Sequence, residues 1–141
     1  MPTTRLGDWY ANLLHIGRRQ LVLALSDRTY LPVVVEAAPI AELVPRLRAG
    51  VSELLLALGV PKGDVAREEA AMDRVAYAKA SDRRVIGVMV DHAKFMDIHL
   101  ARSSSLLELS LTLAGTPCGP LYKTSSAFPN DTARALFAAN D

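Results

Sequence analysis

Three histidines, His15, His92 and His99, are the side chains of this sequence most easily recruited for acid–base chemistry or metal binding. On a helix, His92 and His99 would share one face, but their spacing of seven residues separates them by roughly 10 Å. One metal ion cannot bridge that distance without a third ligand, and the spacing matches no zinc signature. We therefore predict no metal site, with His99 packed at a helix edge and His92 in a polar loop.

Cys118 is the only cysteine and lies in the sequence Thr-Pro-Cys-Gly-Pro. A nucleophilic thiol needs a lowered pKa and a base held nearby, and the sequence places no base beside this one. The flanking prolines and Gly119 indicate a rigid turn in which Cys118 fills space as a small apolar side chain. A single cysteine forms no intrachain disulfide and is typical of a reducing compartment.

Two arginine pairs are candidates for binding phosphate or carboxylate groups. Arg18 and Arg19 lie at the tip of an expected hairpin, and Arg83 and Arg84 precede an expected strand. If the two strand starts lie side by side, four guanidinium groups converge. The favoured interpretation is simpler, because basic residues at hairpin tips protect sheet edges and improve solubility. The net charge of +1 gives no general support for nucleic-acid binding.

Three residues of the first strand, Trp9, Asn12 and His15, could also contact a ligand. Asn12 is predicted to share a face with leucines of the hairpin, and a buried amide there must find hydrogen-bond partners. It either organises the sheet, which we favour, or faces a binding pocket. Trp9 could stack on a base, although core or interface packing is its usual role. The candidate binding residues are Trp9, Asn12, His15, Arg18, Arg19, Arg83 and Arg84.

The element that positions most of these residues is a β-hairpin over residues 9–26. A two-residue turn at Gly17-Arg18, with glycine first, pairs Ile16 with Arg19 and Tyr10 with Leu25. A second turn at residues 27–28 leads to a third strand over 30–35, with Leu25 opposite Tyr30 and Val22 opposite Val33. The N-terminal part of the chain is therefore predicted to be a three-stranded β-meander.

Alternation along the meander makes both faces of its sheet apolar. We expect the sheet to be covered on both sides, by helices or by a second copy of the chain. Pro32 has no backbone N–H, so the third strand is predicted to lie at a sheet edge.

Further helices are predicted over residues 45–58, ended by Gly59, and over 61–72, 91–102 and 129–138. Further strands are predicted over 75–78, 85–90 and 107–113, and a loop over 116–120. The predicted fold is α+β, an antiparallel sheet begun by the meander with helices packed on it, in a single domain over 1–141.

Several function classes lose support because their signatures are missing. The glycines never take the spacing of a phosphate-binding or dinucleotide-binding loop, and no Gly-x-Ser-x-Gly motif occurs. No secretory signal is recognisable, and no apolar run reaches the 18 or so residues of a membrane span. We expect a soluble, cytoplasmic protein with no membrane partner and no cofactor.

The hairpin resembles one shared by small uncharacterised bacterial proteins known only as a domain of unknown function. Those proteins read Trp, an aromatic residue or His, Ala or Cys, Asn and Leu, followed by a basic pair and an apolar strand. The matching residues here are Trp9, Ala11, Asn12, Leu13, Arg18 and Arg19. The sequence His-Ile-Gly at 15–17 departs from the family's Thr-Ile-Asn. The resemblance implies a bacterial source and an α+β fold, and it implies no activity.

The favoured function is a non-catalytic binding or interaction domain that self-associates as a homodimer through an apolar sheet face. The alternative is a protein that binds nucleic acid or phosphate through Arg18, Arg19, Arg83 and Arg84. An enzyme that uses Cys118 or a histidine is the least favoured of the three.

Overall fold

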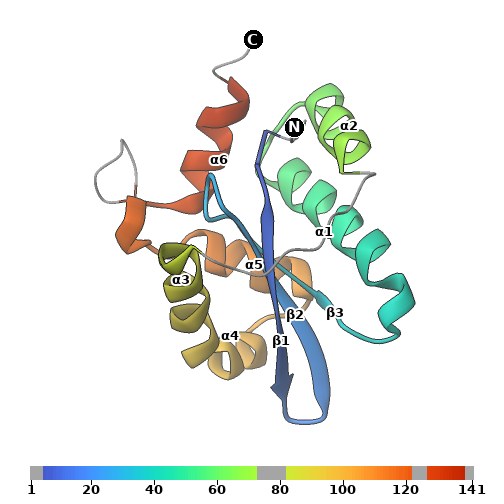
Figure 1. The fold of residues 1–141 in the computed structure, drawn as a ribbon, viewed down its shortest axis with the longest axis vertical. Helices are drawn as coiled ribbons and strands as arrows, with labels where there is room; N and C mark the ends of the chain where they lie inside the picture. Colours follow the sequence, from blue (N-terminus) through green and yellow to red (C-terminus); the bar gives the residue numbers. More distant parts are fainter. Residues whose placement is uncertain (1–4, 73–81, 122–126, 139–141) are drawn as a thin grey trace.

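The computed structural model describes residues 5–72, 82–121 and 127–138. Its centre is a three-stranded antiparallel sheet in the order β1-β2-β3. The strands are β1 (Trp9–Ile16), β2 (Arg19–Ser26) and β3 (Pro32–Glu36). Helices lie on both sides of this sheet, so the predicted α+β fold is confirmed (Figure 1).

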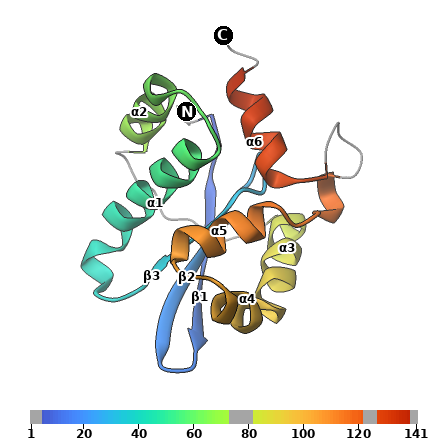
Figure 2. The ribbon, with the colours of Figure 1, turned by 180° about the vertical axis from the view of Figure 1, so that it is seen from behind.

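The helices follow the meander in the chain. They are α1 (Leu43–Ala57), α2 (Lys62–Ala71), α3 (Arg83–Lys94), α4 (Met96–Arg102), α5 (Leu106–Ala114) and α6 (Pro129–Ala138), with short 3-10 turns η1 (Ile40–Glu42) and η2 (Gly119–Leu121). In Figure 1, α1 and α2 lie on one side of the strands, and α3 and α4 lie on the other. The reverse view in Figure 2 shows α5 crossing between these two groups. No helix in the described part of the chain is long and apolar enough to cross a membrane.

The hairpin forms as predicted. Tyr10 pairs with Leu25 and Ile16 pairs with Arg19. Gly17 has a φ of 61° at the first turn position, which suits glycine because the residue has no Cβ. The turn therefore fixes the register of all eight residues of β1.

The predicted register of the third strand is wrong by two residues. Leu25 lies opposite Pro32, and Val22 lies opposite Val35. The difference arises because the turn is longer than two residues: the Tyr30 N–H donates to the Ser26 carbonyl at 2.9 Å, and Tyr30 has a left-handed φ of 60°. A shift of two residues keeps every side chain on its predicted face.

Each face of the sheet has its own hydrophobic core, as the alternation predicted, and helices of the same chain cover both faces. Val22 and Val33 are buried within the chain, so they are not available for the predicted dimer contact through a sheet face. On one face, Val22, Val33 and Val35 pack against buried residues of α1, α2 and α6. On the other face, Leu21, Leu23, Leu25 and Val34 pack against α3, the start of α4 and α5; the main contributors from these helices are Val85, Val88, Met89, Met96, Leu109 and Leu113.

Two predicted strands are helices. Residues 85–90 belong to α3 and residues 107–113 belong to α5. In α3 the buried residues Val85, Val88, Met89 and His92 follow the helical spacing i, i+3, i+4 and i+7. In α5 the leucines at every second position do not indicate a strand. They occur because this helix contributes side chains to both cores. The predicted strand over 75–78 lies outside the described residues.

The predicted helices are confirmed with small changes at their ends. α1 begins at Leu43, two residues before the expected Pro45, and α2 and α6 match the predicted ranges closely. The helix predicted over 91–102 is divided, since α3 continues to Lys94 and α4 begins at Met96.

A buried acidic cluster attaches the N-terminal segment to α2. The two carboxylate oxygens of Glu68 accept hydrogen bonds from the Arg5 N–H at 2.8 Å and the Leu6 N–H at 3.2 Å. The buried carboxylate of Asp64 forms ion pairs with Arg5 and Arg67. The cluster holds Leu6 fully buried in the core beside α1 and α2.

Gly50 marks the closest approach of α1 to the sheet. A Cβ at this position would lie 3.0 Å from a methyl group of Val33 and 3.0 Å from a methyl group of Val35. Alanine in a helix normally gains about 1 kcal/mol over glycine. Overpacking of a buried contact costs about 1–3 kcal/mol. The substitution Gly50→Ala is therefore expected to lower the free energy of unfolding.

Gly87 provides the matched control for this substitution. It also lies within a helix, α3, but a Cβ there would meet no atom within 4 Å. Gly87→Ala should raise the midpoint of urea unfolding, whereas Gly50→Ala should lower it. Equal increases for both variants would contradict the close packing of α1 on β3.

Candidate functional site

The structure separates the two arginine pairs. Arg19 lies opposite Ile16 at the hairpin tip. Arg83 begins α3, and the residue before it contacts Tyr10 near the other end of β1. Tyr10 and Ile16 are six residue steps apart along the strand, a distance of about 20 Å. The four guanidinium groups therefore do not converge in one patch.

Arg19 and Arg84 are each paired with a carboxylate. Arg19 forms an ion pair with Glu36 across the sheet, and Arg84 forms one with Asp82. Arg83 is exposed. These placements suit exposed surface charges more than a shared phosphate site, in line with the simpler of the two sequence interpretations.

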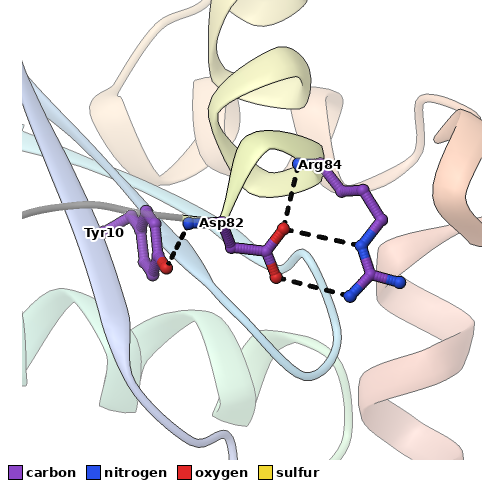
Figure 3. Close-up of polar contacts among 3 residues, drawn as sticks. All are labelled: Tyr10, Asp82 and Arg84. Carbon is purple, nitrogen blue, oxygen red and sulfur yellow. Dashed lines mark hydrogen bonds and ion pairs between the residues drawn. The ribbon is translucent and has the colours of Figure 1, made fainter.

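A polar contact connects the start of α3 to β1 (Figure 3). The Tyr10 hydroxyl accepts a hydrogen bond from the Asp82 backbone N–H at 3.0 Å, and the Asp82 carboxylate accepts one from the Arg84 N–H at 2.9 Å. The latter bond caps the helix and lowers the pKa of Asp82 below its usual value. Sequence reasoning missed this contact, although an aspartate before a helical spacing of apolar residues is a typical helix start.

The three candidate binding residues on β1 differ in how deeply they are buried. Trp9 is half-buried against the core beneath α1, and its indole N–H is buried with no hydrogen-bond acceptor among the described residues. Asn12 and His15 are exposed. The prediction of a buried Asn12 amide is wrong, because β1 lies at the edge of the sheet and the core on this side is centred on β2 and β3.

A hollow of about 130 Å³ lies between α3, the start of α4 and the loop that follows α5. It brings together three residues considered above, His92, His99 and Cys118, with Asp91 beside them. His92 is only 5 % exposed, because it lies on the core face of α3. Its predicted place in a polar loop is therefore wrong.

The chemistry available in this hollow is limited by burial. Burial lowers the pKa of His92 to about 4, so its imidazole is neutral at pH 7. Burial also raises the pKa of Cys118 to about 11, so the thiol stays protonated. Its Sγ lies 3.9 Å from the Thr116 carbonyl oxygen, which it approaches as a weak donor. Cys118 fills space in the core, as predicted.

Metal binding finds no support in the geometry. No group of three histidine, cysteine, aspartate or glutamate side chains lies close enough to hold a metal ion in the described ranges 5–72, 82–121 and 127–138. His92, His99, Asp91 and Cys118 line the same hollow, but no three of them lie close enough together to share one ion.

The outer edge of β1 is the most unusual surface of the sheet. None of its eight residues, Trp9–Ile16, carries a charged side chain, and none is proline. Its pairing with β2 is continuous, without a bulge. Ala11, Asn12 and Leu13 are exposed, and Leu13 retains 50 % of its accessible surface. Natural proteins usually protect such an edge with charges, proline or a bulge.

The opposite edge of the sheet has that protection. At β3, Pro32 has no N–H to offer, and the Val34 N–H donates to the Ser110 hydroxyl of α5 at 3.0 Å. α5 itself lies along β3 and contributes leucines to the cores on both sides. The two edges of one sheet thus differ, because α5 hydrogen-bonds to the backbone of β3, whereas α3 contacts β1 without such a bond to its outer edge among the described residues.

The comparison with known proteins adds one finding. A family model described as a domain of unknown function matches residues 1–132. No curated protein and no solved structure matches the chain.

Proposed function

Because the chain belongs to the family DUF6933, a domain of unknown function, we propose its role from its geometry alone: it is an interaction domain that forms a homodimer through the outer edge of β1. The observation that carries this proposal is the uncharged, exposed strand edge opposite a protected one. An edge of this kind presents unpaired N–H and C=O groups to another strand.

The hairpin turn determines which backbone groups face outward. In a two-residue hairpin the residues that flank the turn exchange both hydrogen bonds, so Ile16 and Arg19 form such a pair. Even-numbered residues of β1 then bond to β2. The odd-numbered residues Trp9, Ala11, Leu13 and His15 direct their N–H and C=O groups away from the sheet.

These outward groups are arranged symmetrically about Asn12. In an antiparallel pair of β1 strands related by a two-fold axis through this position, Ala11 lies opposite the partner's Leu13. Trp9 lies opposite the partner's His15, and the two Asn12 amides face each other across the axis. A dimer of this kind joins two three-stranded sheets into one sheet of six strands, and each contact occurs twice.

A second copy of the chain suits this edge better than an unrelated strand does. The strand has no charge that would select a charged partner, and its exposed side chains are small or apolar at the central positions Ala11 and Leu13. The exposed Asn12 amide can both donate and accept, so it is complementary to its own copy.

Two measurements test the proposal. One is the mass of the protein in solution, and the other is the effect of double substitutions at positions that the proposed register places opposite each other. The unmodified chain should have twice the 15.2 kDa mass of one chain in light scattering. The double variant Ala11→Lys/Leu13→Lys places two lysines opposite each other at two points of the interface, and it should be monomeric. The double variant Ala11→Glu/Leu13→Lys places opposite charges there instead, and it should restore the dimer.

A matched control is Leu56→Lys, which changes an exposed leucine of α1 that is 46 % exposed. This variant should remain dimeric. A monomeric unmodified chain would contradict the proposal. Equal effects of the two double variants would contradict the register centred on Asn12.

A further inference from the structure

The hollow of about 130 Å³ beside α3 is separate from the strand edge. Its inner part is formed by buried side chains, and its mouth includes exposed ones. The buried residues are Val88, His92, Leu113 and Cys118. At the mouth, Asp91 is exposed and Phe95 keeps 55 % of its accessible surface.

One residue that lines this hollow has a buried polar atom without a protein partner among the described residues. The Nε2 atom of His92 is shielded from solvent and makes no hydrogen bond within the described part of the chain. Nearly all buried polar groups in native proteins are hydrogen-bonded, and exceptions often have a functional reason. The neutral imidazole can accept one hydrogen bond and donate another.

The other groups in the hollow restrict what could bind there. Val88, Phe95 and Leu113 offer apolar and aromatic surface. Its volume of about 130 Å³ is close to that of apolar cavities, of about 150 Å³, that accept a benzene-sized ring. The carboxylate of Asp91 at the mouth disfavours an anionic ligand.

We propose that this hollow binds a small, uncharged aromatic molecule that carries a hydroxyl group. Its ring packs against Val88, Phe95 and Leu113, and its hydroxyl forms a hydrogen bond with the imidazole of His92. The ring is bound by burial of apolar surface, and the hydrogen bond selects an alcohol over a hydrocarbon of the same size. Cys118 contributes only to the wall.

Three probes of similar size separate these contributions: phenol, toluene and benzoate. Each is titrated into the full chain and followed by two-dimensional NMR of the backbone amides. Phenol should bind most tightly and shift the amides of α3 and the end of α5. Toluene should bind more weakly, and benzoate should not bind because of its charge.

Two substitutions locate the site. His92→Leu should weaken phenol binding about tenfold, the size of effect expected from one hydrogen bond, and leave toluene binding unchanged. The control His15→Leu changes an exposed histidine of β1 and should alter neither. Val88→Phe fills the hollow and should abolish the binding of both probes.

Several outcomes would overturn the proposal. One is the absence of saturable shifts with phenol in the unmodified chain, which would show that the hollow contains only solvent. Another is equal phenol binding by the unmodified chain and by His92→Leu. Toluene binding confirms that His92→Leu is folded. If this variant does not fold, the site is tested with Val88→Phe alone, and unchanged phenol binding by that variant would overturn the proposal. The Ala11→Lys/Leu13→Lys variant should bind phenol normally, so a failure of the dimer proposal is distinguished from a failure here.

Discussion

Acidification from pH 6.5 to about 4 should destabilise the protein by about 3 kcal/mol through His92 alone. In the unfolded chain this histidine has an ordinary pKa near 6.5, whereas burial lowers its pKa in the folded protein to about 4. Between these values the unfolded state binds a proton that the folded state excludes. The stability contributed by neutral His92 is therefore complete above pH 6.5 and is lost as the pH falls toward 4.

The surroundings of His92 explain the direction of this effect. Desolvation in the core beside α3 is its main cause, and the positive field of His99 acts in the same direction. Asp91 opposes both, but its side chain is exposed to solvent. The protonated imidazole would have to be buried in a core where the exposed Asp91 carboxylate offsets only part of the desolvation cost.

Replacing His92 with leucine should remove this acid sensitivity. Urea unfolding measured at several values between pH 7 and 4.5 should give a flatter stability profile for His92→Leu than for the unmodified chain. At pH 7 the variant should be more stable by about 1–2 kcal/mol, because a buried polar atom without a partner is replaced by an apolar group. His99→Leu serves as the comparison, since His99 is less buried. Parallel profiles for His92→Leu and the unmodified chain would show that another group dominates acid unfolding.

Loss of the Glu68 carboxylate should have the largest effect on stability at neutral pH. Glu68 is 3 % exposed, and it is the acceptor for the backbone N–H groups of Arg5 and Leu6. Glu68→Ala removes the acceptor of the buried Leu6 N–H and of the part-buried Arg5 N–H, and it removes a carboxylate from beside Arg5. The expected loss of unfolding free energy is about 3–5 kcal/mol.

Two further variants show that the loss comes from these hydrogen bonds. Glu68→Gln keeps the shape of the side chain but only one acceptor oxygen, so its effect should be intermediate. Glu69→Ala removes the neighbouring carboxylate, which bonds to the Ser52 hydroxyl at 2.9 Å, and it should cost no more than about 1 kcal/mol. The amides of Arg5 and Leu6 should also lose protection from hydrogen exchange in Glu68→Ala. If all three substitutions had equal effects, the cluster would not be what holds the N-terminal segment.

The hairpin could be predicted from the sequence because its determinants are local. A turn that starts with glycine and two alternating flanks specify pairing between residues close in the chain, and Gly17 has the positive φ that this turn requires. The predicted register of the third strand is wrong because the extra turn residues end at Tyr30, a residue with no obvious preference for the left-handed conformation it adopts.

The segments of α3 and α5 that the sequence predicts as strands show where the spacing of apolar residues alone is ambiguous. Leucine at every second position of α5 suggests a strand, but the same segment also contains leucines at helical spacing. The deciding signal is the start of the helix, where Ser105 caps the N–H of Glu108 at 3.0 Å in the pattern Ser-x-x-Glu. At α3 the N-cap residue Asp82 gives a simpler signal, since its side chain accepts from the Arg84 N–H.

The candidate sites depended on these assignments. The predicted strand over 85–90 places His92 in the loop that follows it, whereas α3 places His92 on its buried face, where it lines the hollow. The separation of the arginine pairs likewise follows from Arg83 and Arg84 starting a helix at the far end of β1. Interactions between distant residues, such as Tyr10 with Asp82, have no signal in a single sequence.

The covering of β3 by α5 has a consequence for the order of folding. The meander consists of contacts between neighbours in the chain, so it can form as soon as its own residues are available. The bond from Val34 to Ser110 spans 76 residues, so β3 is covered only after most of the chain has been synthesised. Until α5 docks, a nascent chain exposes open strands on both sides of its sheet. This interval is when the protein is most exposed to aggregation with other unfinished chains, and when a chaperone would protect it most.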